Sequence, residues 1–109
     1  MGWLFVCFDL PVTEAEQMRE ATNFRKYLLD SGYFMLQQSI YVRSCVSYEK
    51  TEKYTNNVKK ASPSNGSICI FYLTDKQWSN SIRIEKTGYK KSKYNVNIGE
   101  ESPKQITFW

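Results

Sequence analysis

Two stretches of this chain are rich in strand-forming residues and apolar on both faces. Residues 3–8 read WLFVCF and residues 67–74 read SICIFYLT. Side chains alternate between the two faces of a strand. The first stretch therefore presents two apolar sets, one of Leu4, Val6 and Phe8 and one of Trp3, Phe5 and Cys7. Such a strand is typical of the middle of a sheet that is covered on both sides, so the fold must supply two covering layers.

Helical patterns separate these strands. Thr13 and Glu16 have the spacing of a capping box, which predicts a helix from there to about residue 30. Gly32 follows as a natural stop. A weaker helical pattern covers residues 48–61, with Tyr54 and Val58 as its apolar anchors. The apolar stripe of the first helix is predicted to contain Ala15, Met18, Ala21, Phe24 and Leu28.

The remaining patterns complete an α+β order. Residues 33–44 form a strand region, 75–81 allow one helical turn, and 82–85 alternate as an edge strand does. The order β-α-β-β-α-β is that of a ferredoxin-like fold with two split βαβ units. We expect residues 1–86 to form this core. Residues 87–109 are expected to form a basic loop and a short C-terminal strand, at 105–109, that pairs with a partner subunit.

A second copy of the chain is the simplest cover for the second sheet face. The two helices of a ferredoxin-like fold lie on one face only. A chain of 109 residues buries a modest fraction of its surface, so oligomerisation helps to complete its core. The sequence therefore predicts a homodimer in which the two sheets stack.

Charge and missing residue types limit the chemistry. The net charge of +4 favours a polyanionic partner. There is no histidine, which excludes Ser-His-Asp and Cys-His sites, so any hydrolysis would depend on carboxylates and a bound cation. Cys7, Cys45 and Cys69 lie in apolar runs without a CxxC pair, which indicates buried free thiols in a reducing cytoplasm. No stretch approaches the roughly 20 apolar residues that span a bilayer, so no membrane partner is expected.

Several motifs, taken in order, are similar to one known family. The chain resembles the second universal CRISPR-associated adaptation protein, the "Cas-two" family, in the version found in type II systems. The resemblance runs from residue 3 to about residue 84, whereas 87–109 match only in character. It is carried by FDLPV (8–12), FRKYL (24–28), GYFMLQQSIY (32–41), GSI (66–68) and TDKQW (74–78).

The resemblance implies a function in CRISPR spacer acquisition. Members of the family are ferredoxin-like homodimers that bridge two dimers of the CRISPR integrase and support captured duplex DNA along a basic surface. Many are also described as metal-dependent endonucleases of RNA or duplex DNA. Whether this chain cleaves is left open by its sequence, and we expect the scaffold role to dominate.

Asp9 is the candidate catalytic and metal-binding residue. It matches the family aspartate at the end of the first strand. The resemblance implies that Asp9 of both subunits holds one Mg²⁺, or another divalent cation, at the dimer axis. Mg²⁺ needs only one or two protein carboxylates because it keeps several waters. The alternative is that Asp9 simply ends a strand and accepts local backbone hydrogen bonds.

Basic residues are the candidate nucleic-acid contacts. Phosphate contacts by Lys and Arg bind without regard to sequence, which suits a protein that must accept any spacer. The alternative is a solvated helix face. Residues 89–94 also interleave Tyr with Lys, although a plain surface loop is favoured there. The candidate set is Arg19, Arg25, Lys26 and Arg43.

A third class, an RNA-binding module with an open sheet, also stays in consideration. Such a module stacks bases on exposed aromatics of neighbouring strands, a role that Phe5 and Phe71 would have to fill. The apolar opposite faces favour a buried sheet instead. Cys7 and Cys69 are predicted to lie on adjacent central strands as small buried hydrophobes.

Overall fold

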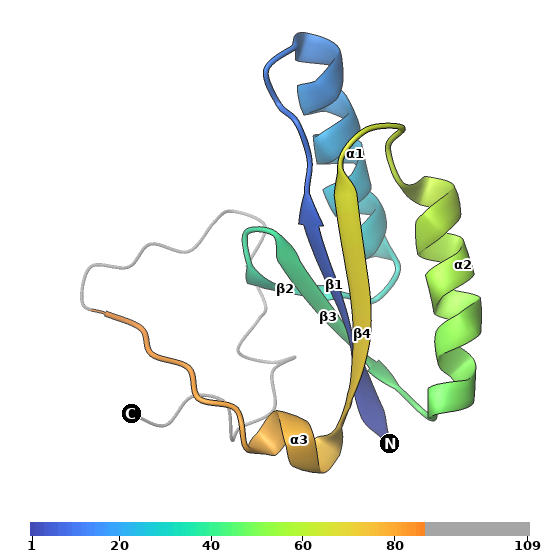
Figure 1. Ribbon diagram of the computed structural model, residues 1–109, viewed down its shortest axis with the longest axis vertical. Coiled ribbons are helices and arrows are strands. Elements are labelled where there is room, and N and C mark those ends of the chain that lie inside the picture. Colours follow the sequence, from blue (N-terminus) through green and yellow to red (C-terminus); the bar gives the residue numbers. More distant parts are fainter. Residues whose placement is uncertain (87–109) are drawn as a thin grey trace.

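Four antiparallel strands and three α-helices make up the computed structural model, which describes residues 1–86. The sheet order is β2-β3-β1-β4, so β1 lies between β3 and β4. Figure 1 shows α1 and α2 beside the sheet and α3 directly after β4. The order β-α-β-β-α-β is therefore confirmed as a ferredoxin-like α+β fold. The elements are β1 (Gly2–Asp9), α1 (Ala15–Asp30), β2 (Phe34–Gln37), β3 (Ile40–Cys45), the 3₁₀ turn η1 (Tyr48–Lys50), α2 (Thr51–Ala61), β4 (Ser67–Thr74) and α3 (Asp75–Ser79).

The main core lies between the sheet and helices α1 and α2. Phe24 and Leu28 of α1 pack with Val58 of α2 against the sheet. The Phe8 and Phe24 rings meet edge to face with their centroids 5.3 Å apart. The alternation of β1 is confirmed, because the set on this face is fully buried: Leu4, Val6 and Phe8.

The first turn of α1 differs from the prediction. The helix is capped at Glu14, one residue after the predicted Thr13, and the reciprocal residue is Gln17 rather than Glu16. The Gln17 side-chain carbonyl accepts hydrogen bonds from the backbone N–H groups of Thr13 and Glu14. The same Gln17 oxygen also accepts a hydrogen bond from the Thr13 hydroxyl, so Thr13 contacts Gln17 without being the cap.

The predicted apolar stripe of α1 is buried only in its C-terminal half. Ala21, Phe24 and Leu28 are buried, whereas Ala15 and Met18 are exposed. In Figure 1 the first turns of α1 extend past the end of the sheet, so nothing from the sheet lies beneath them. Gly32 ends the segment as predicted, with a φ of +93° that favours glycine.

The second sheet face carries its own buried cluster. Phe5, Phe34 and Val42 contact Trp78 of α3, and Trp78 meets the Phe5 ring edge to face at 4.7 Å between centroids. The single helical turn predicted at 75–81 therefore covers one end of this face, which the sequence analysis had assigned wholly to a second copy of the chain. Nearer the other end, Cys69 is exposed and Phe71 is 41% exposed.

Three further expectations need correction. Residues 82–85 form no strand, and Ile82 and Ile84 are exposed. Cys69 lies beside Cys7 as predicted, but β4 is an edge strand of this sheet rather than a central one. Among the three cysteines only Cys45 is buried, because Cys7 and Cys69 point toward the partly open end of the second face.

The segment predicted to pair with a partner subunit, 87–109, lies outside the described residues. The same holds for the Tyr–Lys run at 89–94, so the boundary of the core at residue 86 stays a prediction. None of the helices within residues 1–86 is both long and apolar enough to cross a membrane.

Candidate functional site

Asp9 lies at the exposed end of β1, opposite Ser67 of β4. Gly66, just before Ser67, allows its own backbone to lie close to the backbone of Asp9. Gly66 has a φ of +107°, and a Cβ atom there would lie 2.8 Å from the backbone oxygen of Asp9. A shallow hollow of about 290 Å³ opens at this end of the sheet, lined by Cys7, Phe8, Asp9, Ser39, Ile40, Ser67 and Cys69.

The Asp9 carboxylate is available to a cation. It makes no ion pair with another residue of the described part of the chain. Within residues 1–86 no cluster of three or more His, Cys, Asp or Glu side chains has the geometry of a metal site. One exposed carboxylate fits half of a Mg²⁺ site, since this ion takes one or two carboxylates and otherwise water. At Asp9 the described residues therefore offer one carboxylate ligand, and a second would have to come from another chain.

Three of the four predicted basic residues lie on α1. Arg19 and Lys26 are both exposed, and their spacing of seven residues puts them on the same side of the helix, opposite Phe24 and Leu28. Arg19 forms an ion pair with Glu16 in the preceding turn. Such exposed pairs contribute little and leave the guanidinium accessible to a phosphate.

Arg25 lies between this outer side and the core. Its guanidinium carbon is 5.4 Å from the centre of the Phe8 ring, within the range of a cation–π contact. The Arg25 Nε is buried and has no hydrogen-bond partner among the described residues. The structure therefore places the guanidinium of Arg25 against Phe8 at the end of β1, next to Asp9 in the chain.

Arg43 is held by internal contacts. One terminal nitrogen donates to the backbone oxygen of Ser31 at 2.7 Å, and its Nε donates to the oxygen of Ser44 at 3.0 Å. The guanidinium carbon lies 4.1 Å from the centre of the Tyr54 ring and 5.8 Å from that of Tyr33. Arg43 thus joins the C-terminal end of α1 to β3 and α2, and the structure does not bring it together with the outer residues of α1.

The environment of Tyr33 reflects the same packing. Burial raises the pKa of the Tyr33 hydroxyl, and the nearby Arg43 opposes that rise. Tyr33 therefore stays protonated at any physiological pH, and its ring acts as a neutral surface for Arg43.

We expect Arg43→Ala to lower the free energy of unfolding by about 2 kcal/mol, since it removes two charge-assisted hydrogen bonds and two ring contacts. Urea unfolding followed by circular dichroism measures this at fixed protein concentration. Arg19→Ala is the matched control and is expected to change stability by less than about 0.5 kcal/mol. Equal losses for the two variants would show that the Arg43 contacts are not stabilising.

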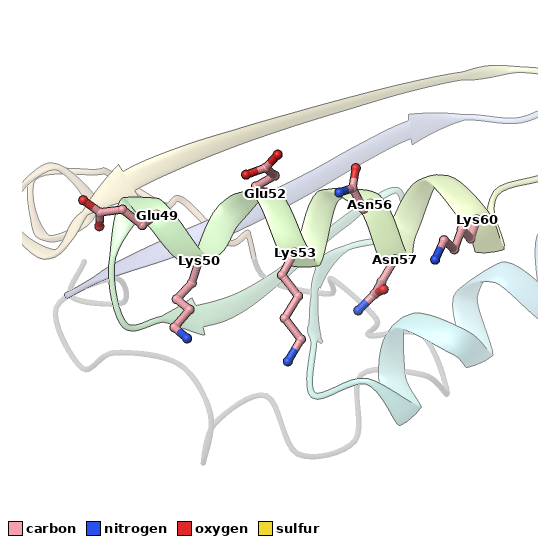
Figure 2. Close-up of a pocket in the computed structure, with 7 residues that line it drawn as sticks. All are labelled: Glu49, Lys50, Glu52, Lys53, Asn56, Asn57 and Lys60. Atoms are coloured by element: carbon pink, nitrogen blue, oxygen red, sulfur yellow. The ribbon is translucent and has the colours of Figure 1, made fainter.

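A further row of cations runs along η1 and α2 and was not among the predicted nucleic-acid contacts. Lys53, Asn57 and Lys60 of α2 point to the same side as Lys50 of η1, whereas Glu49 of η1 and Glu52 of α2 point to the other (Figure 2). A hollow of about 510 Å³ runs along this helix. The described residues that line it all lie between positions 49 and 60. The signal was the spacing of 50, 53, 57 and 60, which places these side chains on one helix side.

Comparison with known proteins identifies the family. The family model described as "CRISPR associated protein Cas2" matches residues 1–81. The chain belongs to the Cas2 family. The resemblance to this family is thereby confirmed, while its type II version stays a prediction, and the family places this Cas2 protein in the adaptation machinery of CRISPR systems. The match contains Asp9 and all four predicted basic residues.

Curated Cas2 relatives share the same region. A protein of Flavobacterium psychrophilum is 42% identical over 76 residues, which cover 70% of this chain and 66% of that protein. A protein of Paracidovorax avenae is 41% identical over 80 residues, which cover 73% of this chain and 74% of the relative. A protein of Ligilactobacillus salivarius is 38% identical over 76 residues, 70% of this chain and 75% of its own length. All three are named CRISPR-associated endoribonuclease Cas2.

Proposed function

We propose that this Cas2 protein is a cytoplasmic, dimeric scaffold that bridges integrase dimers and holds duplex DNA without sequence preference. The observation that carries the proposal is the exposed, outward placement of Arg19 and Lys26 on α1. Cations on the outside of a rigid helix contact phosphates rather than base edges, and such contacts carry no sequence information. The lysines on one side of α2 add charge to the same helical layer.

The partly open second sheet face supports the dimer. Trp78 covers one end of this face, while Phe71 remains 41% exposed and stacks on Phe5 with ring centroids 5.0 Å apart. Pairing two copies through this face would bury these side chains. The helices with their cations would then lie on the outside, free to meet DNA.

The test is a size measurement of the full chain alone, with a short DNA duplex, and with the duplex and its integrase. We expect a dimer alone, a salt-sensitive complex with duplexes of unrelated sequence, and one assembly that contains two integrase dimers. A monomer that binds no duplex at low salt would overturn the proposal.

A metal-dependent nuclease is the second candidate. It is favoured by the names of the relatives, which are called endoribonucleases, and by the exposed carboxylate of Asp9. Asp9 from two subunits would hold one Mg²⁺, which would activate a water and offset charge on the scissile phosphate. This reading expects cleavage of RNA or duplex DNA that requires Mg²⁺ and is lost in Asp9→Asn.

For the scaffold, we expect Asp9→Ala to leave both duplex binding and spacer integration unchanged, because Asp9 lies at the end of β1 and away from the outer side of α1. The measurement is integration of a labelled duplex into repeat-containing DNA by the integrase and the variant together. Integration abolished while duplex binding stays intact would contradict the scaffold reading and favour the nuclease.

A further inference from the structure

We propose that Cys7 and Cys69 form an oxidisable dithiol, which a peroxide converts to a disulfide between β1 and β4. This inference goes beyond the proposed function and depends only on the geometry of one protomer. It concerns two side chains for which neither the scaffold nor the nuclease has a use.

The register of the sheet places the two residues directly opposite each other. Cys7 of β1 is the partner of Cys69 of β4, and the pairing is antiparallel. Opposite residues of antiparallel strands have Cα atoms about 4.5 or 5.5 Å apart, and both values lie within the range of disulfides. Directly opposite side chains also leave the sheet on the same face. The two sulfurs can therefore meet without a change in strand pairing.

The two thiols differ in their exposure to solvent. Cys69 is exposed, whereas Cys7 is partly buried. Oxidants select accessible thiolates, so Cys69 is the residue that reacts first and Cys7 is the one that resolves.

Cys45 provides an internal comparison. It is 1% exposed, and its thiol donates a hydrogen bond to the backbone oxygen of Ser47 at 3.1 Å. It lies on β3 opposite Gly2, at the other end of β1 from Asp9. It has no cysteine opposite it and is expected to stay reduced.

The chemistry balances with hydrogen peroxide as the oxidant. The Cys69 thiolate attacks one peroxide oxygen, which breaks the O–O bond and leaves a sulfenic acid and hydroxide. The Cys7 sulfur then attacks the Cys69 sulfur, so that an S–S bond forms and the S–O bond breaks. The protons of the two thiols leave in two molecules of water. The two sulfurs are oxidised together by two electrons, and the peroxide is reduced.

The location gives the disulfide a consequence for the site. Cys7 and Cys69 line the same shallow hollow as Asp9. A disulfide there would fix β4 to β1 one residue pair away from Phe8 and two pairs away from Asp9, at the partly open end of the second sheet face. Oxidation would therefore change the surface on which Asp9 lies.

The test treats the full chain with hydrogen peroxide and counts thiols under denaturing conditions. We expect the count to fall from three to one, with dithiothreitol restoring it. Peptide mapping is expected to find Cys7 joined to Cys69 within one chain, and the remaining thiol is expected to be Cys45. Cys7→Ser and Cys69→Ser, each nearly isosteric, should form no such link.

Protein concentration serves as a second variable, because pairing of the second face would shield Cys69. The reaction is followed from dilute to concentrated protein, and the intrachain link is expected at the lowest concentration. The proposal is overturned if three thiols remain at every concentration. It is equally overturned if Cys45 reacts as fast as Cys69, or if every disulfide joins two chains.

Discussion

Reversing the charges of Arg19 and Lys26 together is expected to weaken duplex DNA binding by about tenfold to a hundredfold at moderate salt. Both side chains are exposed on the same side of α1, so each is in a position to contact a phosphate. The double variant, R19E with K26E, replaces two attractive charges by two repulsive ones. Fluorescence anisotropy with a labelled duplex measures the change.

The salt dependence gives this prediction a sharper form. Each lost phosphate contact lowers the slope of log K against log salt by about 0.9, so the double variant should lose about 1.8 for each protomer that contacts the duplex. The loss should be the same for duplexes of unrelated sequence, because contacts with phosphates do not distinguish bases. A loss confined to one sequence would show that α1 reads bases instead.

A matched control separates local contact from net charge. K76E with K86E makes the same change in net charge on two exposed lysines, and Lys76 belongs to α3 at the far end of the sheet from the first turns of α1 (Figure 1). This pair is expected to reduce affinity far less than the α1 pair. Equal reductions would mean that DNA responds to overall charge and that α1 has no special role.

Phe24→Ala is expected to lower the free energy of unfolding by about 3–5 kcal/mol. Phe24 is 1% exposed and packs edge to face on Phe8 in the main core. Its removal leaves a cavity between α1 and the sheet, which closes only in part because α1 is also held by Leu28. Urea unfolding at fixed protein concentration measures the loss, since a dimer would make stability depend on concentration.

Met18 on the same helix is the control for Phe24. It is 55% exposed, two turns nearer the N-terminus, where α1 extends past the sheet. Met18→Ala is expected to change stability by less than about 0.5 kcal/mol. A loss comparable with that of Phe24→Ala would show that the first turns of α1 are buried in solution, for example against a second copy of the chain.

The sequence was sufficient for the order of the elements from β1 to β4 because its signals are local. Alternation assigned the side chains of β1 to the correct faces, and helical spacing placed Phe24 and Leu28 in the core. For the strand region at 33–44, the sequence left the position of the turn open. The structure resolves it as a hairpin of β2 and β3, with Tyr41 on the helical face and Val42 on the other.

The candidate site was predicted less completely, because a residue type does not reveal what surrounds it. Asp9 and the basic residues of α1 could be named from motif and charge, yet Arg43 was grouped with them although it packs against Tyr54. The row of lysines along η1 and α2 was not predicted because its members are interspersed with Glu and Asn along the chain and gather on one side only when the helix forms.

By itself the sequence determined the order of elements, the faces of the central strand and the family, since each follows from neighbouring residues or from motifs. Only the tertiary structure decided that Trp78 covers part of the second face and that Met18 stays exposed. The tertiary structure also decided that residues 82–85 form no strand and that Cys69 is exposed to solvent, opposite Cys7. The physical reason is that burial depends on which distant segment lies above a side chain, and apolar character alone does not say where a layer ends.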